Sequence, residues 1–161
     1  MKRTASANRH PWLDGLRKLP ILAGCTEREL DAVAAAMTPV TVPAGRRLVD
    51  EGTVGREALI IEEGHAVVCQ GGAEVAMLGP GDLVGEMAVL SRGRRCASVT
   101  AVTPLKVHDA SAAEFRALLE RAPGLRARVL ATAAARGLTT PAARVLEPQP
   151  RGRWLRRTAR A

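Results

Sequence analysis

A glutamate and an arginine close together in the chain, Glu86 and Arg95, are the side chains best suited to bind a ligand. Gly85 precedes the glutamate, and the apolar run 87–90 predicts a short helical turn after it. A turn entered through glycine presents unpaired backbone N–H groups, which suit a phosphate oxygen. Arg95 would add a bidentate, permanently charged guanidinium to the same anion. A carboxylate repels a bare phosphate but accepts a hydrogen bond from a hydroxyl, so these residues predict a pocket for a ribose phosphate.

The order of these residues resembles the phosphate-binding cassette of the cyclic nucleotide-binding domain family. That family includes the catabolite activator proteins of bacteria and the regulatory subunits of protein kinase A. Its pattern is approximately Phe-Gly-Glu-(apolar)-Ala-Leu-Leu, a short loop, and then Pro-Arg-(small)-Ala-(Thr/Ser)-Val. Residues 84–90 read Val-Gly-Glu-Met-Ala-Val-Leu, and residues 94–99 read Arg-Arg-Cys-Ala-Ser-Val. Val84, Arg94 and Cys96 depart from the pattern, because the family has Phe, Pro and, in many bacterial members, Ser or Thr there.

The resemblance implies a role for each matched position. Glu86 would hold the ribose 2′-hydroxyl and Arg95 the cyclic phosphate, while backbone N–H groups of the turn complete the phosphate site. Gly85 is the one glycine that we expect to be needed for close approach of the ligand. The implied ligand is cyclic AMP or cyclic GMP, with no metal. The implied binding residues are Gly85, Glu86, Met87, Ala88, Arg95, Cys96 and Ala97.

The surrounding sequence predicts a mainly β domain with flanking helices. From Val40 to His108, short apolar runs alternate with glycine-containing turns about every 8–12 residues, as in a small β-barrel or jelly roll. The family spaces its glycines similarly, so the resemblance covers residues 16–136. It implies an eight-stranded jelly-roll (double-stranded β-helix) barrel with an N-terminal helix and two C-terminal helices. We expect His65 and His108 at strand ends, and Cys96 as a small buried side chain.

Three helices are expected around the strands. Thr26 and Glu29 have the spacing of a capping box, which predicts the start of the first helix. The second helix is expected to be capped by residues 109–111 and to stop before Pro123. The third would end near Gly137. In relatives the last helix closes over the bound base, so the resemblance implies that ligand binding moves this helix.

The excess positive charge lies at the two ends of the chain. The net charge is +8, yet residues 11–136 hold 15 basic and 15 acidic side chains. This pattern predicts a basic tail at 1–15, a cyclic nucleotide-binding domain at 16–136, and a basic, Pro- and Arg-rich tail at 137–161. The C-terminal tail suits weak, non-specific contact with nucleic acid or an anionic surface. We interpret Trp154 as part of this solvated tail.

Several other classes of site and protein are not expected. The three cysteines lie far apart and form no Cys-x-x-Cys pair, which argues against a zinc site, an iron–sulfur cluster or a disulfide framework. Neither a signal peptide nor a membrane span is expected, so the predicted location is the cytoplasm. An enzyme is not expected, because arginine stays protonated and cannot shuttle protons. No catalytic residue is predicted.

The sequence therefore predicts a stand-alone cyclic nucleotide-binding sensor module that signals to an unidentified protein partner through its C-terminal helix. One alternative is a degenerate scaffold that keeps the fold but binds no nucleotide. Another is a Crp/Fnr-like transcriptional regulator without its own helix-turn-helix, since we expect the 25 residues after Arg136 to be too few for one. Thr139 and Thr140 are the candidates for reading the base.

Overall fold

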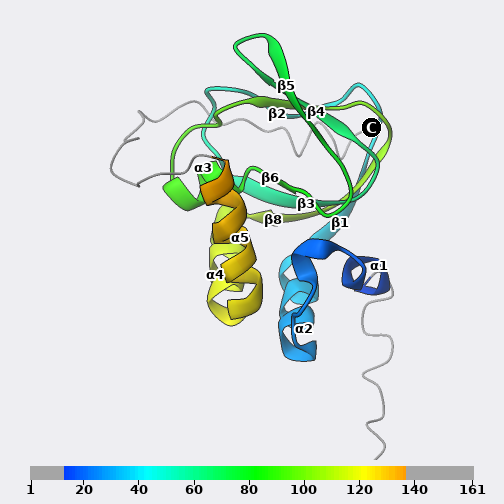
Figure 1. Ribbon diagram of the computed structural model, residues 1–161, viewed down its shortest axis with the longest axis vertical. Helices are drawn as coiled ribbons and strands as arrows, with labels where there is room; N and C mark the ends of the chain where they lie inside the picture. Colours follow the sequence, from blue (N-terminus) through cyan, green and yellow to red (C-terminus); the bar gives the residue numbers. More distant parts are fainter. Residues whose placement is uncertain (1–12, 137–161) are drawn as a thin grey trace, which may run out of the picture.

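The computed structural model describes residues 13–136, and in this part of the chain eight strands form two antiparallel, four-stranded sheets (Figure 1). One sheet has the order β1-β8-β3-β6 and consists of Thr38–Val42, Leu105–Ser111, Glu57–Glu63 and Leu83–Val84. The other has the order β2-β7-β4-β5 and consists of Arg47–Val49, Ser98–Ala101, Ala66–Gln70 and Ala73–Leu78. The two sheets are not closed into one hydrogen-bonded barrel within the described residues.

The longer helices lie below the β1-β8-β3-β6 sheet in the view of Figure 1. Helix α1 (Leu13–Arg17), the 3-10 turn η1 (Pro20–Leu22) and helix α2 (Glu27–Ala36) precede the strands. Helix α3 (Glu86–Ser91) lies between β6 and β7, while α4 (Ala112–Arg121) and α5 (Pro123–Ala135) follow β8. The prediction of a mainly β domain with flanking helices is confirmed. The N-terminal helix starts inside the segment 1–15, which the charge pattern predicts to be a tail, and the side chain of Leu13 is already buried.

Side-chain caps fix the starts of two helices as the sequence predicts. The backbone N–H of Glu29 donates to Thr26 Oγ1 at 3.2 Å, and the N–H of Thr26 donates back to Glu29 Oε1 at 3.3 Å. Ser111 Oγ accepts a hydrogen bond from the N–H of Glu114 at the start of α4. Both arrangements satisfy amide groups that have no partner within the helix.

Strand β3 separates two apolar cores. Successive side chains in a strand point to opposite faces, so Ala58 and Ile60 pack with the helices while Leu59 and Ile61 pack between the sheets. All four side chains are fully buried. Burial on both faces explains why this strand is continuously apolar instead of alternating.

His108 corrects one expectation about the strands. It lies in the middle of β8 and not at a strand end, because β8 continues to Ser111 through pairing with β1 and β3. The His108 ring is fully buried, and its Nε2 lies 2.7 Å from Oε2 of Glu62. Burial lowers the pKa of His108, and the hydrogen bond to Glu62 opposes that change. His65 does precede a strand, β4, as expected.

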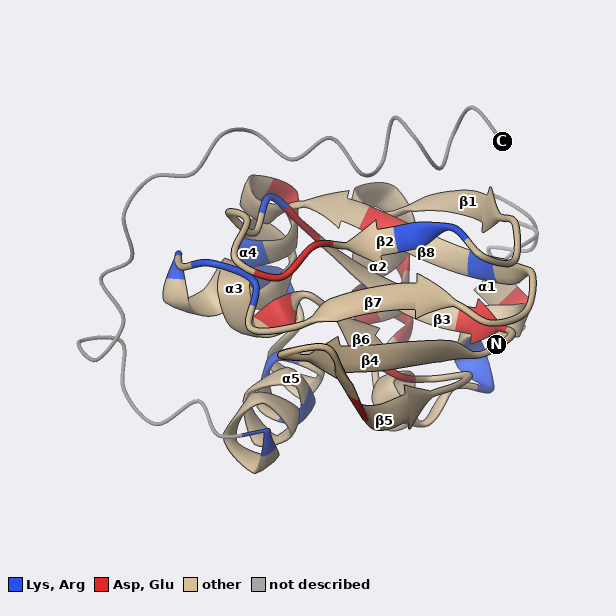
Figure 2. Ribbon diagram, turned by 90° about the horizontal axis from the view of Figure 1, so that it is seen from above, with Lys and Arg blue, Asp and Glu red and all other residues tan. Residues whose placement is uncertain are grey.

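The segment between β6 and β7 crosses from one sheet to the other. Strand β6 pairs with β3, and β7 pairs with β2 and β4, so α3 and the loop after it bridge the two sheets. Figure 2 shows acidic and basic segments interspersed around the described domain, with basic residues in this loop and along α5. None of the described helices is long and apolar enough to cross a bilayer.

Two leucines on neighbouring helices test the placement of the helical core. Leu118 on α4 is 1% exposed and Leu130 on α5 is 44% exposed. We expect Leu118→Ala to lower the free energy of unfolding by about 2–5 kcal/mol through lost burial and an unfilled cavity. Leu130→Ala, the same chemical change, should cost about 0.5 kcal/mol or less. Urea unfolding measures both, and equal losses would contradict this packing.

Candidate ligand-binding site

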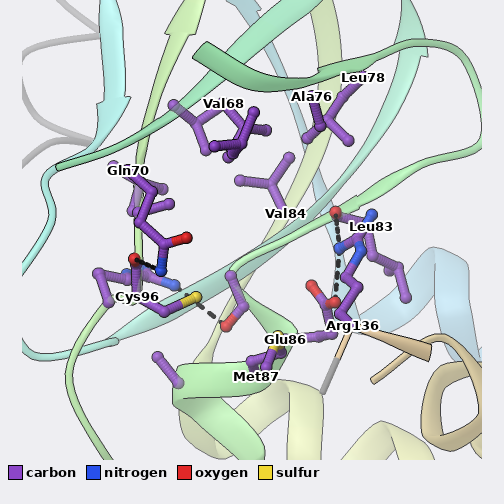
Figure 3. A pocket seen from close by; sticks show the side chains of 17 residues that line it. Val68, Gln70, Ala76, Leu78, Leu83, Val84, Glu86, Met87, Cys96 and Arg136 are labelled. Atoms are coloured by element: carbon purple, nitrogen blue, oxygen red, sulfur yellow. Dashed lines mark hydrogen bonds and ion pairs between the residues drawn. The ribbon is translucent and has the colours of Figure 1, made fainter. Parts of the chain in front are cut away.

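A cavity of about 230 Å³ lies between the two sheets, helix α3 and the C-terminal end of α5 (Figure 3). Its apolar walls come from both sheets and include Val49, Val68, Ala76, Leu78, Val84 and Val99. All seven residues predicted from the sequence line this one cavity. Gln70 and Arg136, which the sequence analysis did not single out, line it as well.

Gly85 and Glu86 begin helix α3 at the edge of the cavity. Gly85 has a φ of +85°, a left-handed conformation that L side chains rarely adopt. The chain therefore turns sharply between β6 and α3, and the side chain of Glu86 is buried beside the cavity. Met87 is half-buried next to it, and Ala88 is buried.

The guanidinium of Arg95 is held by two backbone carbonyls. Its Nη2 donates to the oxygen of Glu57 at 2.8 Å, and its Nη1 donates to the oxygen of Gly85 at 3.1 Å. A Cβ atom on Gly85 would overlap this guanidinium and lie 2.8 Å from the carbonyl oxygen of Glu57. Glycine is thus required at position 85 so that the Arg95 side chain can fit. This requirement is separate from the close approach of a ligand that the sequence predicts at the same residue.

Acidic side chains surround the arginine on the side of strand β8. Asp109 is buried, and its Oδ1 has no hydrogen-bond partner among the described residues. The pKa of Asp109 is raised to about 7, mainly by burial and in addition by repulsion from Glu57 and Glu114, while the charge of Arg95 opposes the rise. Burial lowers the pKa of Arg95, while Glu57, Glu86 and Asp109 raise it. A guanidinium stays protonated in proteins, so the cavity keeps one buried positive charge here.

Arg136, at the end of α5, pairs with Glu86. Its Nη1 lies 2.5 Å from Glu86 Oε1 and donates to the carbonyl oxygen of Leu83 at 2.8 Å (Figure 3). Burial raises the pKa of Glu86, and the charge of Arg136 is the largest influence that opposes the rise. The sequence pattern alone does not single out Arg136. The signal available was its position at the end of the last predicted helix, which the resemblance places over the ligand.

Cys96, Ala97 and Gln70 also line the cavity, away from the Glu86–Arg136 pair (Figure 3). Gln70 Nε2 donates to the carbonyl oxygen of Cys96 at 3.1 Å and so joins β4 to the loop before β7. The expectation that Cys96 is buried is wrong, because its side chain is half-buried and lines the cavity. Thr139, Thr140 and Trp154 lie outside the described residues. Within residues 13–136, no group of His, Cys, Asp or Glu side chains is arranged to hold a metal ion.

Comparisons with known proteins agree on one family. The model of the cyclic nucleotide-binding domain matches residues 39–122. The cAMP-dependent protein kinase regulatory subunit of Yarrowia lipolytica is 37% identical over 114 residues, which are 69% of this chain and 30% of that protein. The chain spans between 14% and 32% of the length of the most similar curated relatives.

Solved structures of similar fold include two kinds of protein. The regulatory domain of Toxoplasma gondii PKA, crystallised with cAMP, has a TM-score of 0.67 and 27% identity, covering 78% of this chain and 49% of that chain. The catabolite activator protein of Thermus thermophilus has a TM-score of 0.65 and 29% identity, covering 73% of this chain and 57% of that chain.

The buried carboxyl of Asp109 predicts a pH-dependent stability. In the folded state its pKa is raised from 3.8 to about 7, so between these values the folded state binds more protons than the unfolded chain. Stability should therefore fall as pH rises through this window. Asp109→Asn cannot lose a proton, so its stability relative to the wild type should be greater at pH 8 than at pH 5 by about 2–3 kcal/mol.

Urea unfolding of both proteins at the two pH values measures this difference. Asn has nearly the shape of a protonated Asp, so the two proteins should differ least at the lower pH. An equal effect of the substitution at pH 5 and pH 8 would mean that Asp109 is not protonated in the folded state.

Proposed function

Because the chain belongs to the cyclic nucleotide-binding domain family, we propose that its cavity binds cyclic AMP or cyclic GMP and that binding is signalled to a partner protein through α5. The observation that carries this proposal is the joint burial of one carboxylate and one guanidinium, Glu86 and Arg95, in a mostly apolar cavity. A ribose phosphate offers a hydroxyl donor for the first and an anion for the second. The role is binding and not catalysis.

The two charged residues take different parts of the ligand. Arg95 uses one donor of each terminal nitrogen on Glu57 and Gly85, and a guanidinium has five N–H donors. Its remaining donors and its charge are available for the cyclic phosphate. Glu86 accepts the 2′-hydroxyl. Met87, Ala88, Cys96 and Ala97 surround the phosphate and ribose, and the apolar side chains of both sheets face the base.

The departures from the family pattern are compatible with this proposal. Val84 is buried among the apolar side chains between the sheets, so it keeps the apolar character of the usual Phe. Arg94 replaces a proline, and its backbone forms a β-bridge with Val54, which fixes the loop just before Arg95. Cys96 replaces a hydroxyl residue, so we propose that the phosphate is held without a side-chain hydroxyl from that position.

The output of the domain is proposed to be the position of α5. This helix packs against α3, α4 and α2, so a shift of the cassette reaches it directly. We further propose that the strand orders of the two sheets form a jelly roll, and that basic tails flank the domain predicted at 16–136, which the helix α1 extends back to Leu13. Weak contact of the C-terminal tail with a polyanion stays a prediction.

A nucleotide-free scaffold is the second candidate function. The pairing of Glu86 with Arg136 favours it, because the carboxylate assigned to the ribose already has a partner. The two candidates differ in one property, which is whether a cyclic nucleotide stabilises the fold.

We expect cyclic AMP or cyclic GMP to raise the melting temperature of the protein. A ligand at about 100 times its dissociation constant stabilises the folded state by about 2.7 kcal/mol. For a domain of this size that corresponds to a rise of about 5–10 °C. Thermal unfolding with each nucleotide at millimolar concentration measures the shift, with linear AMP as the non-cyclic control.

Two arginine variants show whether the shift comes from the proposed site. Arg95→Lys keeps the charge but loses the bidentate geometry, and we expect it to weaken binding about tenfold to a hundredfold. Arg92→Asn removes a charge from the same loop at an exposed residue with a φ of +56°, a conformation that Asn tolerates. It should leave affinity nearly unchanged. Equal losses would point to general attraction by the loop, and no shift with any nucleotide would favour the scaffold.

A further inference from the structure

The end of helix α5 occupies the polar corner of the cavity. Arg136 Nη1 contacts both Oε1 of Glu86 and the carbonyl oxygen of Leu83 (Figure 3). The Glu86 side chain is 1% exposed and that of Arg136 is 30% exposed. The carboxylate is therefore buried beneath a guanidinium that itself reaches solvent.

This contact stabilises the domain in the absence of ligand. A carboxylate buried without a partner is costly, because it loses its hydration. The charge of Arg136 reduces that cost for Glu86. The cavity beside the pair, at about 230 Å³, is smaller than the roughly 300–1,000 Å³ of typical ligand pockets. The guanidinium thus fills space and gives the carboxylate a hydrogen-bond donor at the position where a ligand hydroxyl would do so.

We infer that Arg136 competes with the 2′-hydroxyl of the nucleotide for Glu86, so that the ligand-free domain blocks the ribose part of its own binding site. This inference rests on the proposed function. A nucleotide that uses Glu86 binds after Arg136 has left the carboxylate, and its observed affinity is reduced because Glu86 is free in only a fraction of the molecules.

The same competition explains how the ligand reaches α5. Arg136 follows the last residue of the helix and ties it to β6 through Leu83 and to α3 through Glu86. Farther back, Leu125, Val129 and Ala133 are fully buried and hold the rest of the helix in place. Displacement of Arg136 therefore releases the final turn of α5 and leaves its first three turns packed.

Isothermal titration of the full chain with cyclic AMP and 2′-deoxy cyclic AMP tests this inference. Without the Arg136 guanidinium the site is open, so Arg136→Ala should bind cyclic AMP about tenfold more tightly than the wild type. The deoxy ligand makes no hydrogen bond to Glu86 and can bind with the Glu86–Arg136 pair in place, so its affinity should change little. The preference for cyclic AMP over the deoxy ligand should therefore widen about tenfold.

Two further variants complete the design. Arg128→Ala removes the same charge from α5 and, among the described residues, breaks an exposed bond to the carbonyl of Pro20 away from the cavity, so both affinities should stay within about twofold of the wild type. Arg136→Gln keeps an amide donor for Leu83 and should behave like Arg136→Ala, which guards against a loss of folding in the alanine variant.

The possible outcomes separate the inference from the proposed function. Weaker cyclic AMP binding by both Arg136 variants would make Arg136 a ligand contact and overturn the competition. The competition would also be overturned if the Arg136 variants and the wild type had the same preference for cyclic AMP over the deoxy ligand. In either case, binding of cyclic AMP by the wild type would still support the proposed function. Binding by the Arg136 variants but not by the wild type would support both. No binding by any variant would overturn both.

Discussion

The structure of the site depends on the cost of burying ionised groups in an apolar cavity. Such groups need a partner of opposite charge or a full set of hydrogen bonds. Arg95 meets this condition with two carbonyl oxygens and the acidic side chains near it. Glu86 meets it with Arg136 from a different part of the chain. The two charges therefore stay separate, and each keeps its capacity to bind a different group of a ligand.

This constraint links the site to the elements around it. The carbonyl oxygens that hold Arg95 come from the start of β3 and from the turn before α3, so the arginine depends on the sheet and on Gly85 together. Strand β3 is fixed from both sides by the two apolar cores. The partner of Glu86 comes from the end of α5, beyond Ala133, the last buried residue of the helix. The groups that hold Arg95 are therefore anchored to the packed cores, whereas the contact that covers Glu86 lies at the end of a helix.

The sequence predicts what is local and misses what the fold brings together. The segment from Gly85 to Ala97 is contiguous, so its spacing alone indicates a site, and all seven predicted residues line one cavity. The capping box of Thr26 and Glu29 and the glycines in turns also depend on residues close together in the chain, so the sequence predicts them. The pairing of Arg136 with Glu86 joins residues 50 positions apart, and only the packing of α5 creates it. His108 is similar, because its place in the middle of β8 depends on pairing with two other strands.

A crystal structure of the full chain with cyclic AMP would test the central claim most directly, namely that the Glu86–Arg136 pair stands where the ribose binds. We expect the cyclic phosphate to lie within hydrogen-bond distance of the Arg95 guanidinium and the 2′-hydroxyl to donate to Glu86. The Arg136 guanidinium should have left the carboxylate, with the last turn of α5 displaced. A bound nucleotide beside an intact Glu86–Arg136 pair, or a phosphate away from Arg95, would contradict the account.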